Sequence, residues 1–409
     1  MITIGLSSIT ESFNSTLVHV SWIVTIYLII MTALQPLAGK LGDLYGNRRL
    51  FLIGLVLFLI ASLICMYAPT LSVLIVGRAL QAIGGALISP NGTAILRYMI
   101  PKEKLAKSFG VFGFVMSIGA AIGPLLGAVL IGVWGWHSTF WVNVPLIIVS
   151  FLVAYLFLPK TKVYAKSPLD SYGALFLAVF LTVLVLIVTN KMYANIWMWL
   201  ICIGTFILFV KRETSIGSPL IDFKLFKKRS FTSANIAILL NNGIMYCTLL
   251  LLPLTFATGY FTLGQVGLLL FIYSVSISIF SWLGGNFEGK FGRGRMIAWA
   301  FISSAIGLTF YLYIPSNESL LIAAIILFVG GIGSGLGVPS MQAASLQAVK
   351  KEMSGVASGI YSTFRYIGST MASVLISLQF SFHWTIFILI GAACIGVIFS
   401  KGFNEARDC

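Results

Sequence analysis

The sequence predicts an all-helical, multi-pass membrane protein, and three observations support that prediction. Of the 409 residues, 59% are hydrophobic and only 9% are charged, a balance outside the usual range of soluble globular domains. The mean hydropathy is +1.01. Apolar stretches of about 20 residues, the length that a helix needs to cross a bilayer, recur from end to end. Lysine and arginine are dense in every second loop between these stretches and sparse in the others.

Thirteen complete spans are predicted. They cover 19–39, 50–68, 71–97, 107–131, 139–158, 169–189, 195–210, 231–257, 263–287, 296–314, 319–348, 355–380 and 384–400. Residues 1–10 are apolar but too short to cross a bilayer on about 20 residues. Because an odd number of spans must start and end on opposite sides, we expect these residues to be the end of a truncated first helix. A short interfacial N-terminus is the alternative.

The positions of the cations orient the chain. Alternate loops contain 23 of the 26 lysines and arginines, including Lys40, Arg48 and Arg49, then Arg97, Lys102, Lys104 and Lys107, then Lys160, Lys162 and Lys166, and finally Lys401 and Arg407; the opposite loops contain only Lys191. The positive-inside rule places the cation-rich loops and the C-terminus in the cytoplasm. The formal charge of +15 therefore indicates topology in the plasma membrane lipid bilayer and no nucleic-acid partner. The five cysteines show no disulfide or metal spacing, and no cofactor is expected.

An internal repeat predicts the domain organisation. GGALISPNGTA from Gly84 aligns with GSGLGVPSMQA from Gly333 at an offset of 249 residues, and GKLGDLYGNRR from Gly39 aligns with GNFEGKFGRGR from Gly285 at an offset of 246. Spans 169–189 and 195–210 have no partner in this scheme. We therefore predict an N-terminal bundle over 1–160, an inserted two-helix hairpin over 161–215 and a C-terminal bundle over 216–409.

GKLGDLYGNRR forms a short turn between two predicted helices. Its glycines allow a tight reversal, and its charges form a compact cluster. We expect the carboxylate of Asp43 to act on a helix N-terminus and on a nearby arginine; a simple topogenic loop is the alternative. The predicted gate residues are Gly39, Gly42, Asp43, Gly46, Arg48 and Arg49.

Polar residues inside predicted spans are candidates for transport chemistry. Arg78 lies about two turns inside its span, where a charge costs at least ~2.5 kcal/mol. Gln81 shares its helical face at i+3, and Arg365 is a second intramembrane cation. Snorkelling is the alternative for Arg78 and backbone hydrogen bonding for Arg365. The candidate substrate contacts are Tyr27, Asn241, Asn242 and Tyr246, for which interhelical hydrogen bonding is the commoner use.

GAAIGPLLGA, residues 119–128, predicts a smooth packing face. Gly119, Gly123 and Gly127 recur at i, i+4 and i+8, while Pro124 removes a backbone donor and bends the helix. We expect this face to contact the small-residue stripe that includes Ser274 and Ser278.

These motifs match a known family in order and position. GKLGDLYGNRR, RALQAIGG and GAAIGPLLGA resemble motifs A, B and C of the major facilitator superfamily, and the whole chain resembles its 14-span drug:proton antiporters. The resemblance implies two pseudo-symmetric helical bundles that export lipophilic or cationic toxic compounds as protons enter. It also implies that Asp43 latches the cytoplasmic ends of the bundles, that Arg78 takes part in proton coupling and that residues 119–128 line the bundle interface.

The sequence also departs from the family pattern. Ala82, Ala128 and Asn47 replace residues common in the motifs, and the second copy of motif A has Gly289, with Glu288 beside it, where the first has Asp43. None of the 11 acidic residues falls at mid-membrane. We expect the missing proton-titrating acid to belong to the truncated first helix.

Three functions follow from these patterns. The leading one is proton-coupled export of an amphiphilic small molecule, a multidrug efflux activity; the others are transport of one dedicated metabolite and an inactive truncated fragment. The sequence leaves accessory export proteins open. No Ser/His/Asp grouping, metal-ligand cluster or nucleotide-binding loop is present, so an enzyme is not expected.

Overall fold

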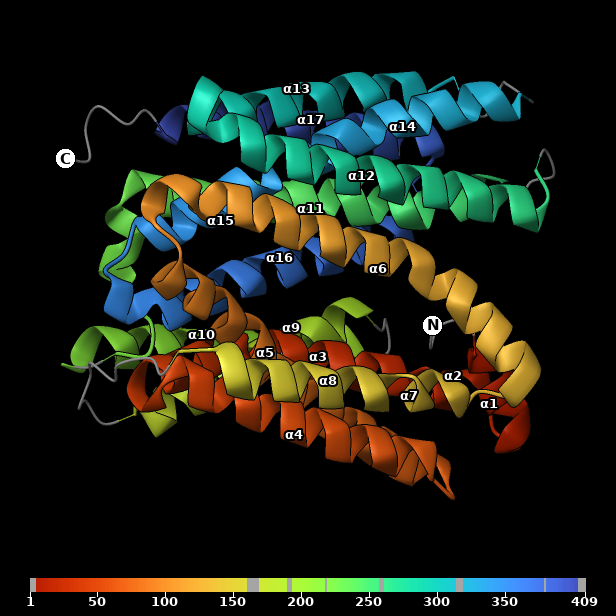
Figure 1. Cartoon of the computed structure of the whole chain (residues 1–409), viewed down its shortest axis with the longest axis horizontal. Helices are drawn as coiled ribbons and strands as arrows, with labels where there is room; N and C mark the ends of the chain where they lie inside the picture. The colour runs from red at the N-terminus through yellow and green to blue at the C-terminus, as the bar shows by residue number, and fades with distance from the viewer. Residues whose placement is uncertain are drawn as a thin grey trace. The chain divides into compact units, whose positions relative to one another are not determined.

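A computed structural model describes residues 5–159, 169–189, 193–217, 219–256, 261–313, 319–378 and 380–403. Within these ranges every regular element is a helix (Figure 1), which confirms the predicted all-helical fold. The predicted loop cations Lys160, Lys162, Lys166, Lys191 and Arg407 lie outside the described residues.

The first half of the chain contains ten α-helices. They are α1 (Leu6–Ser12), α2 (Leu17–Val20), α3 (Trp22–Tyr45), α4 (Asn47–Met66), α5 (Leu71–Met99), α6 (Leu105–Trp134), α7 (Ser138–Trp141), α8 (Asn143–Phe157), α9 (Ser171–Thr189) and α10 (Ile196–Ser215) among the described residues, with a 3-10 turn, η1, at Lys102–Lys104.

The second half continues in the same way. Its described helices are α11 (Arg229–Phe256), α12 (Leu263–Phe291), α13 (Arg293–Tyr311), α14 (Leu320–Leu336), α15 (Val338–Gln347), α16 (Ser354–Ser377) and α17 (Phe382–Ser400), with 3-10 turns η3 (Phe223–Lys227), η5 (Lys351–Met353) and η6 (Lys401–Phe403).

Each of the thirteen predicted spans coincides with one or two of these helices. Three of them are divided: 19–39 between α2 and α3, 139–158 between α7 and α8, and 319–348 between α14 and α15. Within the described residues, ten segments are long and apolar enough to cross a membrane. Helices α10, α13 and α16 coincide with predicted spans but are absent from those ten. The sequence of α16 explains its low hydropathy, because serine, threonine and glycine alternate with its apolar residues. The chain is a multi-pass membrane protein.

The contacts divide the chain into two units. Unit 1 contains Met1–Tyr98, Gly123–Phe223 and Lys350–Thr363, whereas unit 2 contains Met99–Ile122, Lys224–Val349 and Phe364–Cys409. Each unit thus includes the beginning of one helix, α16 or α6, that comes from the other half of the sequence. The predicted division at 1–160, 161–215 and 216–409 follows the repeat rather than these contacts, and it stays a prediction.

Two glycines mark equivalent turns of the repeat. Gly46 ends α3 with φ of 98°, and Gly292 ends α12 with φ of 82°, values that residues with a side chain rarely adopt. Their backbone N–H groups donate to Gly42 O and to Glu288 O, both at 2.8 Å. The two turns are 246 residues apart, which is the offset of the aligned motifs, so the same geometry closes both copies.

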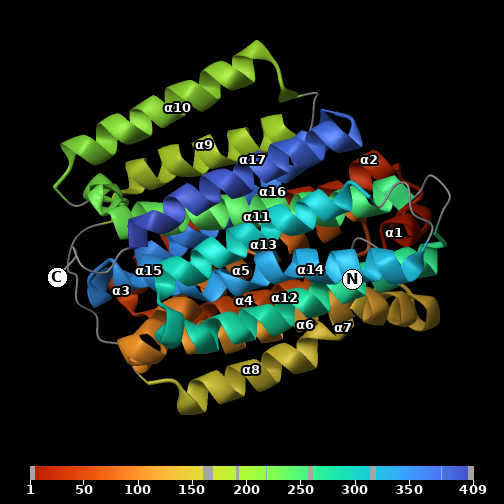
Figure 2. The same ribbon diagram turned by 90° about the horizontal axis from the view of Figure 1, so that it is seen from above.

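The hairpin of α9 and α10 lies within unit 1, with the two helices side by side (Figure 2). Arg212 near the end of α10 donates from Nε and Nη2 to the Asp170 carboxylate at 3.2 Å. Burial alone raises the pKa of Asp170, but the hydrogen bonds from Arg212 outweigh burial and hold that pKa below its ordinary value. This ion pair joins the two ends of the hairpin.

Candidate functional site

The carboxylate of Asp43 caps the N-terminus of α16. Its Oδ1 accepts from Gly355 N at 2.8 Å, and its Oδ2 accepts from Val356 N at 2.9 Å. The side chain of Asn47 adds a hydrogen bond to the same carboxylate, and Asp43 is only 7% exposed. A carboxylate at this position satisfies two orphan N–H donors and opposes the positive end of the helix dipole. The predicted contact of Asp43 with a helix N-terminus is confirmed.

Around this cap, the backbones of α3 and α16 lie very close together. A Cβ on Gly39 would overlap Gly355 O, and a Cβ on Gly359 would lie 2.5 Å from Gln35 O. Gly42 likewise has no room for a side chain because those of Asn47 and Asn91 occupy the space. The predicted Gly39, together with Gly359, which was not predicted, therefore lets α3 and α16 approach so closely that the Asp43 carboxylate reaches the helix N-terminus.

The predicted pairing of Asp43 with an arginine is wrong. Arg48 donates from Nη2 to Tyr155 O at 2.6 Å on α8, and its guanidinium lies 5.7 Å from the Tyr155 ring centroid. Arg49 is exposed. In unit 1, the cation that acts on the Asp43 carboxylate is Lys40, which also donates to Pro219 O at 3.0 Å. Arg48 instead ties the start of α4 to α8.

Residues near the end of α5 also bond to the first part of α16 and to the turn before it. The sequence did not predict these bonds. The Tyr98 hydroxyl donates to Lys351 O at 2.7 Å, and Thr93 hydrogen-bonds Ser358. Asn91 donates to Ala38 O at 3.2 Å. The aligned segment GGALISPNGTA marked this stretch as a repeat, but it carried no signal for partners more than 250 residues away.

Arg78 and Gln81 lie in one buried network in unit 1, in agreement with their predicted shared face. Arg78 is 8% exposed and donates from Nε to Ile23 O at 3.0 Å and from Nη1 to Gln81 Oε1. Gln81 donates in turn to Ser62 Oγ at 2.8 Å. The guanidinium carbon of Arg78 lies 4.2 Å from the ring centroid of Tyr27. A cation over an aromatic face is favourable, so protein groups hold the guanidinium on several sides.

Asn241 and Asn242 take different places in unit 2. Asn241 is 1% exposed and donates to Ser334 O at 3.1 Å, so it joins α11 to α14. Asn242 donates to Arg365 O at 2.7 Å and to Ser369 Oγ at 2.5 Å, so it joins α11 to α16. Tyr246, one turn further along α11, interacts with Ser369 and lies within electrostatic range of Arg365. Both asparagines make interhelical hydrogen bonds, as the alternative interpretation expects.

The close contact of α6 with α12 lies nearer the N-terminus of α6 than predicted. A Cβ on Gly119 or Gly123 would meet nothing within 4 Å, whereas one on Gly110 would lie 2.9 Å from Ser281 O. The expected contact of Gly119 with Ser274 or Ser278 is therefore wrong, whereas the contact expected of Gly127 stays a prediction. Gly127 is buried, and the surroundings of the Pro124 side chain lie outside the described structure.

This α6–α12 crossing repeats the α3–α16 crossing. A Cβ on Gly285 would lie 2.5 Å from Ala106 O, much as Gly39 meets Gly355. No carboxylate corresponds to Asp43, because Gly289 takes its place and faces open space. The two crossings share their backbone packing but differ in charge.

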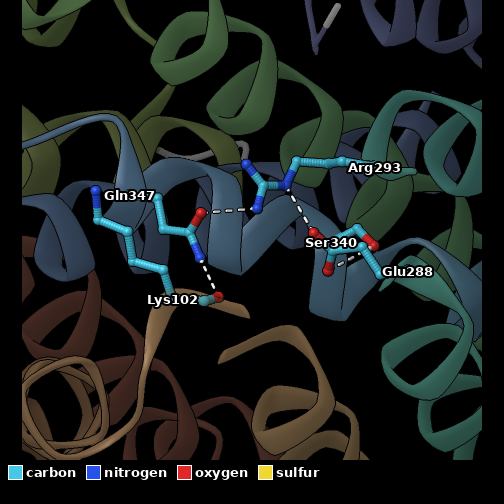
Figure 3. Close-up of polar contacts among 5 residues, drawn as sticks. All are labelled: Lys102, Glu288, Arg293, Ser340 and Gln347. Atoms are coloured by element: carbon cyan, nitrogen blue, oxygen red, sulfur yellow. Dashed lines mark hydrogen bonds and ion pairs between the residues drawn. The ribbon is translucent and has the colours of Figure 1, made fainter. Parts of the chain in front are cut away.

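A polar network lies at the same end of unit 2 (Figure 3). Arg293 donates from Nε to Glu288 Oε1 at 2.8 Å and from Nη2 to Gln347 Oε1 at 2.9 Å. Gln347 then donates to Lys102 O at 2.8 Å, and Ser340 donates to Glu288 at 3.4 Å. The Glu288 carboxylate thus pairs with Arg293 and joins α12 to α13. The contact with η1, the turn before α6, is made by the neutral side-chain amide of Gln347.

Unit 2 also contains an apolar cavity of 270 Å³ between α11, α16 and α17. Its walls include Leu239, Ile244, Met371 and Leu375, and no polar side chain lines it. It offers apolar contact without a group that could orient a polar ligand.

Two sequence repeats of membrane-spanning helices, with charges at helix ends and a few polar groups inside, define a multi-pass membrane transporter. The comparison of families identifies it further: the model of the Major Facilitator Superfamily matches residues 1–373. The chain belongs to this superfamily, whose members transport small molecules and are not enzymes.

Three relatives show the range of proteins that the chain resembles. It is 42% identical to the uncharacterised MFS-type transporter YvkA of Bacillus subtilis (strain 168), over 99% of this chain and 92% of that protein. It is 29% identical to Multidrug resistance protein 3 of the same organism, over 86% and 70%. It is 25% identical to the riboflavin transporter RibZ of Clostridioides difficile (strain 630), over 91% and 82%.

Proposed function

We propose that this transporter is a 14-span-type antiporter that exports lipophilic small molecules from the cell in exchange for protons. The observation that carries the proposal is the Asp43 carboxylate on the N-terminus of α16, which lies in the motif predicted to form the cytoplasmic gate. Multidrug resistance protein 3 supports the substrate class, because it is a relative over 86% of this chain.

In this proposal, breaking the Asp43 cap opens the cytoplasmic side, and forming it closes that side. Alternating access requires a contact of this kind that exists in one state and is absent in the other. The buried Arg78 network, with Gln81 and Tyr27, would form the proton-coupling region. Residues 119–128 of α6 would line the bundle interface in another state of the cycle.

The topology belongs to the same proposal. The cation-rich loops and the C-terminus would face the cytoplasm, with the protein in the plasma membrane. A fluorescent reporter that matures only in the cytoplasm, fused to the C-terminus, should fluoresce. A reporter that is active only outside the cytoplasm should stay silent.

Transport in proteoliposomes tests the function. Purified protein should move several lipophilic fluorescent dyes of unlike shape when a pH gradient is imposed, and collapsing the gradient should abolish transport. Arg78→Gln should lower the rate at least tenfold, because it removes the charge over Tyr27 and the bond to Ile23 O. Lys211→Gln, which removes an exposed cation of α10 outside the gate motif, should stay within twofold of the unaltered protein.

The relative RibZ favours a second candidate, transport of one dedicated metabolite. Riboflavin should therefore be included in the same assay. Transport of riboflavin alone, with none of the dyes moving, would replace multidrug export by this candidate. Equal transport with and without the pH gradient would contradict proton antiport.

A further inference from the structure

Arg365 lies near the middle of α16, the helix that coincides with the predicted span 355–380. It follows Ser354, the first residue of α16, by 11 residues, which corresponds to about 16 Å at 1.5 Å per residue. That is roughly the middle of a hydrocarbon layer about 30 Å thick. A charge at this depth is costly and usually marks a functional site.

Unlike the guanidinium of Arg78, that of Arg365 is not held by hydrogen bonds to other described groups of the protein. Within the residues that the structure describes, its guanidinium donates no hydrogen bond and joins no ion pair. Its nearest ring is Tyr366, with 5.5 Å between the guanidinium carbon and the ring centroid. Arg365 is partly exposed, so its donors remain available to a ligand.

Neutral polar residues lie next to Arg365. Asn242 on α11 bonds Arg365 O and Ser369 Oγ, which fixes α11 against α16 beside the cation. Tyr246 is 39% exposed and, like Tyr366, lies within electrostatic range of Arg365. Tyrosine hydroxyls can donate a hydrogen bond to an anion, so they complement the guanidinium.

No carboxylate of the described part of unit 2 balances Arg365. The acids there are Glu103, which is exposed in η1 between two lysines, and Glu288, which is paired with Arg293 at the end of α12. A ligand that enters this region of unit 2 therefore meets a cation that no described carboxylate of the unit balances. A cationic ligand would be repelled, whereas an anionic group would replace the missing counter-ion.

We propose that Arg365, with Tyr246 and Tyr366, binds a carboxylate on the exported compound, so that the substrates are lipophilic anions or zwitterions. The planar guanidinium donates two parallel hydrogen bonds to the two oxygens of a carboxylate, which a lysine ammonium cannot do. This inference rests on the proposed export function and narrows its substrate class.

Three matched probes test the substrate class. They are pyrenebutanoate, its neutral amide and pyrenebutylammonium, which share the apolar part and differ in the polar group. Their dissociation constants are measured with the full chain in phosphatidylcholine nanodiscs. The carboxylate should bind at least tenfold more tightly than the amide, a difference of about 1.4 kcal/mol, and the ammonium should bind most weakly.

The variants separate the role of Arg365 from general damage. Arg365→Gln should weaken carboxylate binding at least tenfold and change amide binding less than twofold. The carboxylate affinity of Arg365→Lys should lie between those of the unaltered protein and Arg365→Gln. Lysine keeps the positive charge but cannot donate two parallel hydrogen bonds. Arg295→Gln, which removes an exposed cation at the start of α13, is the control and should bind all three probes normally. If Arg365→Gln does not fold, Arg365→Lys and Tyr246→Phe decide, each with a selective loss for the carboxylate.

Three results would overturn the inference: equal binding of carboxylate and amide to the unaltered protein, unchanged carboxylate binding in Arg365→Gln and Arg365→Lys, or displacement of the carboxylate by phosphatidylglycerol, which would assign the site to a lipid phosphate. Failure of this inference is distinguishable from failure of the proposed function. Carboxylate selectivity without proton-driven transport contradicts only the proposed function, and dye export without selectivity contradicts only this inference.

Discussion

Replacing Asp43 by asparagine tests the gate directly. The Asp43→Asn substitution keeps the size of the side chain and one oxygen acceptor. It removes the negative charge from a carboxylate that accepts from Gly355 N and Val356 N at 2.8 and 2.9 Å. The backbone packing of Gly39 against Gly355 stays in place. The substitution therefore weakens the cap without creating a cavity.

The magnitude follows from the two hydrogen bonds. Each hydrogen bond to a charged group contributes about 1.5–3 kcal/mol, and the carboxylate gains up to about 2 kcal/mol more from the helix dipole in partly buried geometry. Because asparagine retains one neutral acceptor, we expect a loss of about 1.5–3 kcal/mol. At 1.4 kcal/mol per tenfold change, the contact should open roughly 10- to 150-fold more often.

Amide hydrogen exchange measures this opening. A peptide that covers residues 350–358 contains the two N–H groups that Asp43 accepts from, and its exchange should accelerate by the factor above in Asp43→Asn. Glu103→Gln removes an exposed carboxylate and serves as the control, with unchanged exchange. If exchange of this peptide in Asp43→Asn stays within twofold of the unaltered protein, the cap does not hold the start of α16.

Four further substitutions test packing and charge. Gly110→Ala should lower stability by about 1–3 kcal/mol through overpacking at α12, whereas Gly119→Ala, which faces open space, should be neutral or stabilising in thermal unfolding. Gly289→Asp, at the position equivalent to Asp43, should slow amide exchange at the start of α6 and slow transport; unchanged exchange would refute the equivalence. Asp170→Asn should lower stability only modestly at pH 7, because the Arg212 side chain is partly exposed and solvent weakens the ion pair. Since hydrogen bonding lowers the folded pKa of Asp170, its contribution is present above the unfolded pKa of about 3.9 and is lost as the pH falls through the folded pKa. The two unfolding curves should therefore converge once the pH has fallen below the folded pKa.

Local features of the site could be predicted from the sequence because local geometry determines them. The turn after α3 needs a positive φ, and Gly46 provides it. Gln81 lies one helical turn from Arg78, so their hydrogen bond follows from helix periodicity. The repeat offset of 246 maps Gly46 onto Gly292, which closes the equivalent turn with a positive φ.

Tertiary partners could not be predicted in the same way. The sequence indicated that Asp43 would meet a helix N-terminus, but α16 begins more than 300 residues later. Arg48 contacts Tyr155 rather than Asp43, and no pattern near either residue indicates that choice. In α6, the i, i+4 spacing of Gly119 and Gly123 and the i, i+3 spacing of Gly110 and Gly113 both predict a packing face. Only the position of α12 decides that the second face makes the close contact.

The two crossings suggest how one protein can combine a fixed contact with a switchable one. Both rely on backbone approach, with Gly39 on Gly355 in one and Gly285 on Ala106 in the other, and such packing is insensitive to protonation. Only the first adds a carboxylate, on Asp43, to that packing. The second has Gly289 at the equivalent position. Protonation of a carboxylate removes its charge from a helix N-terminus, so under the proposed antiport a proton can weaken the α3–α16 contact and leave the α6–α12 contact unchanged. The asymmetry between the repeats would then couple protons to opening at one crossing alone.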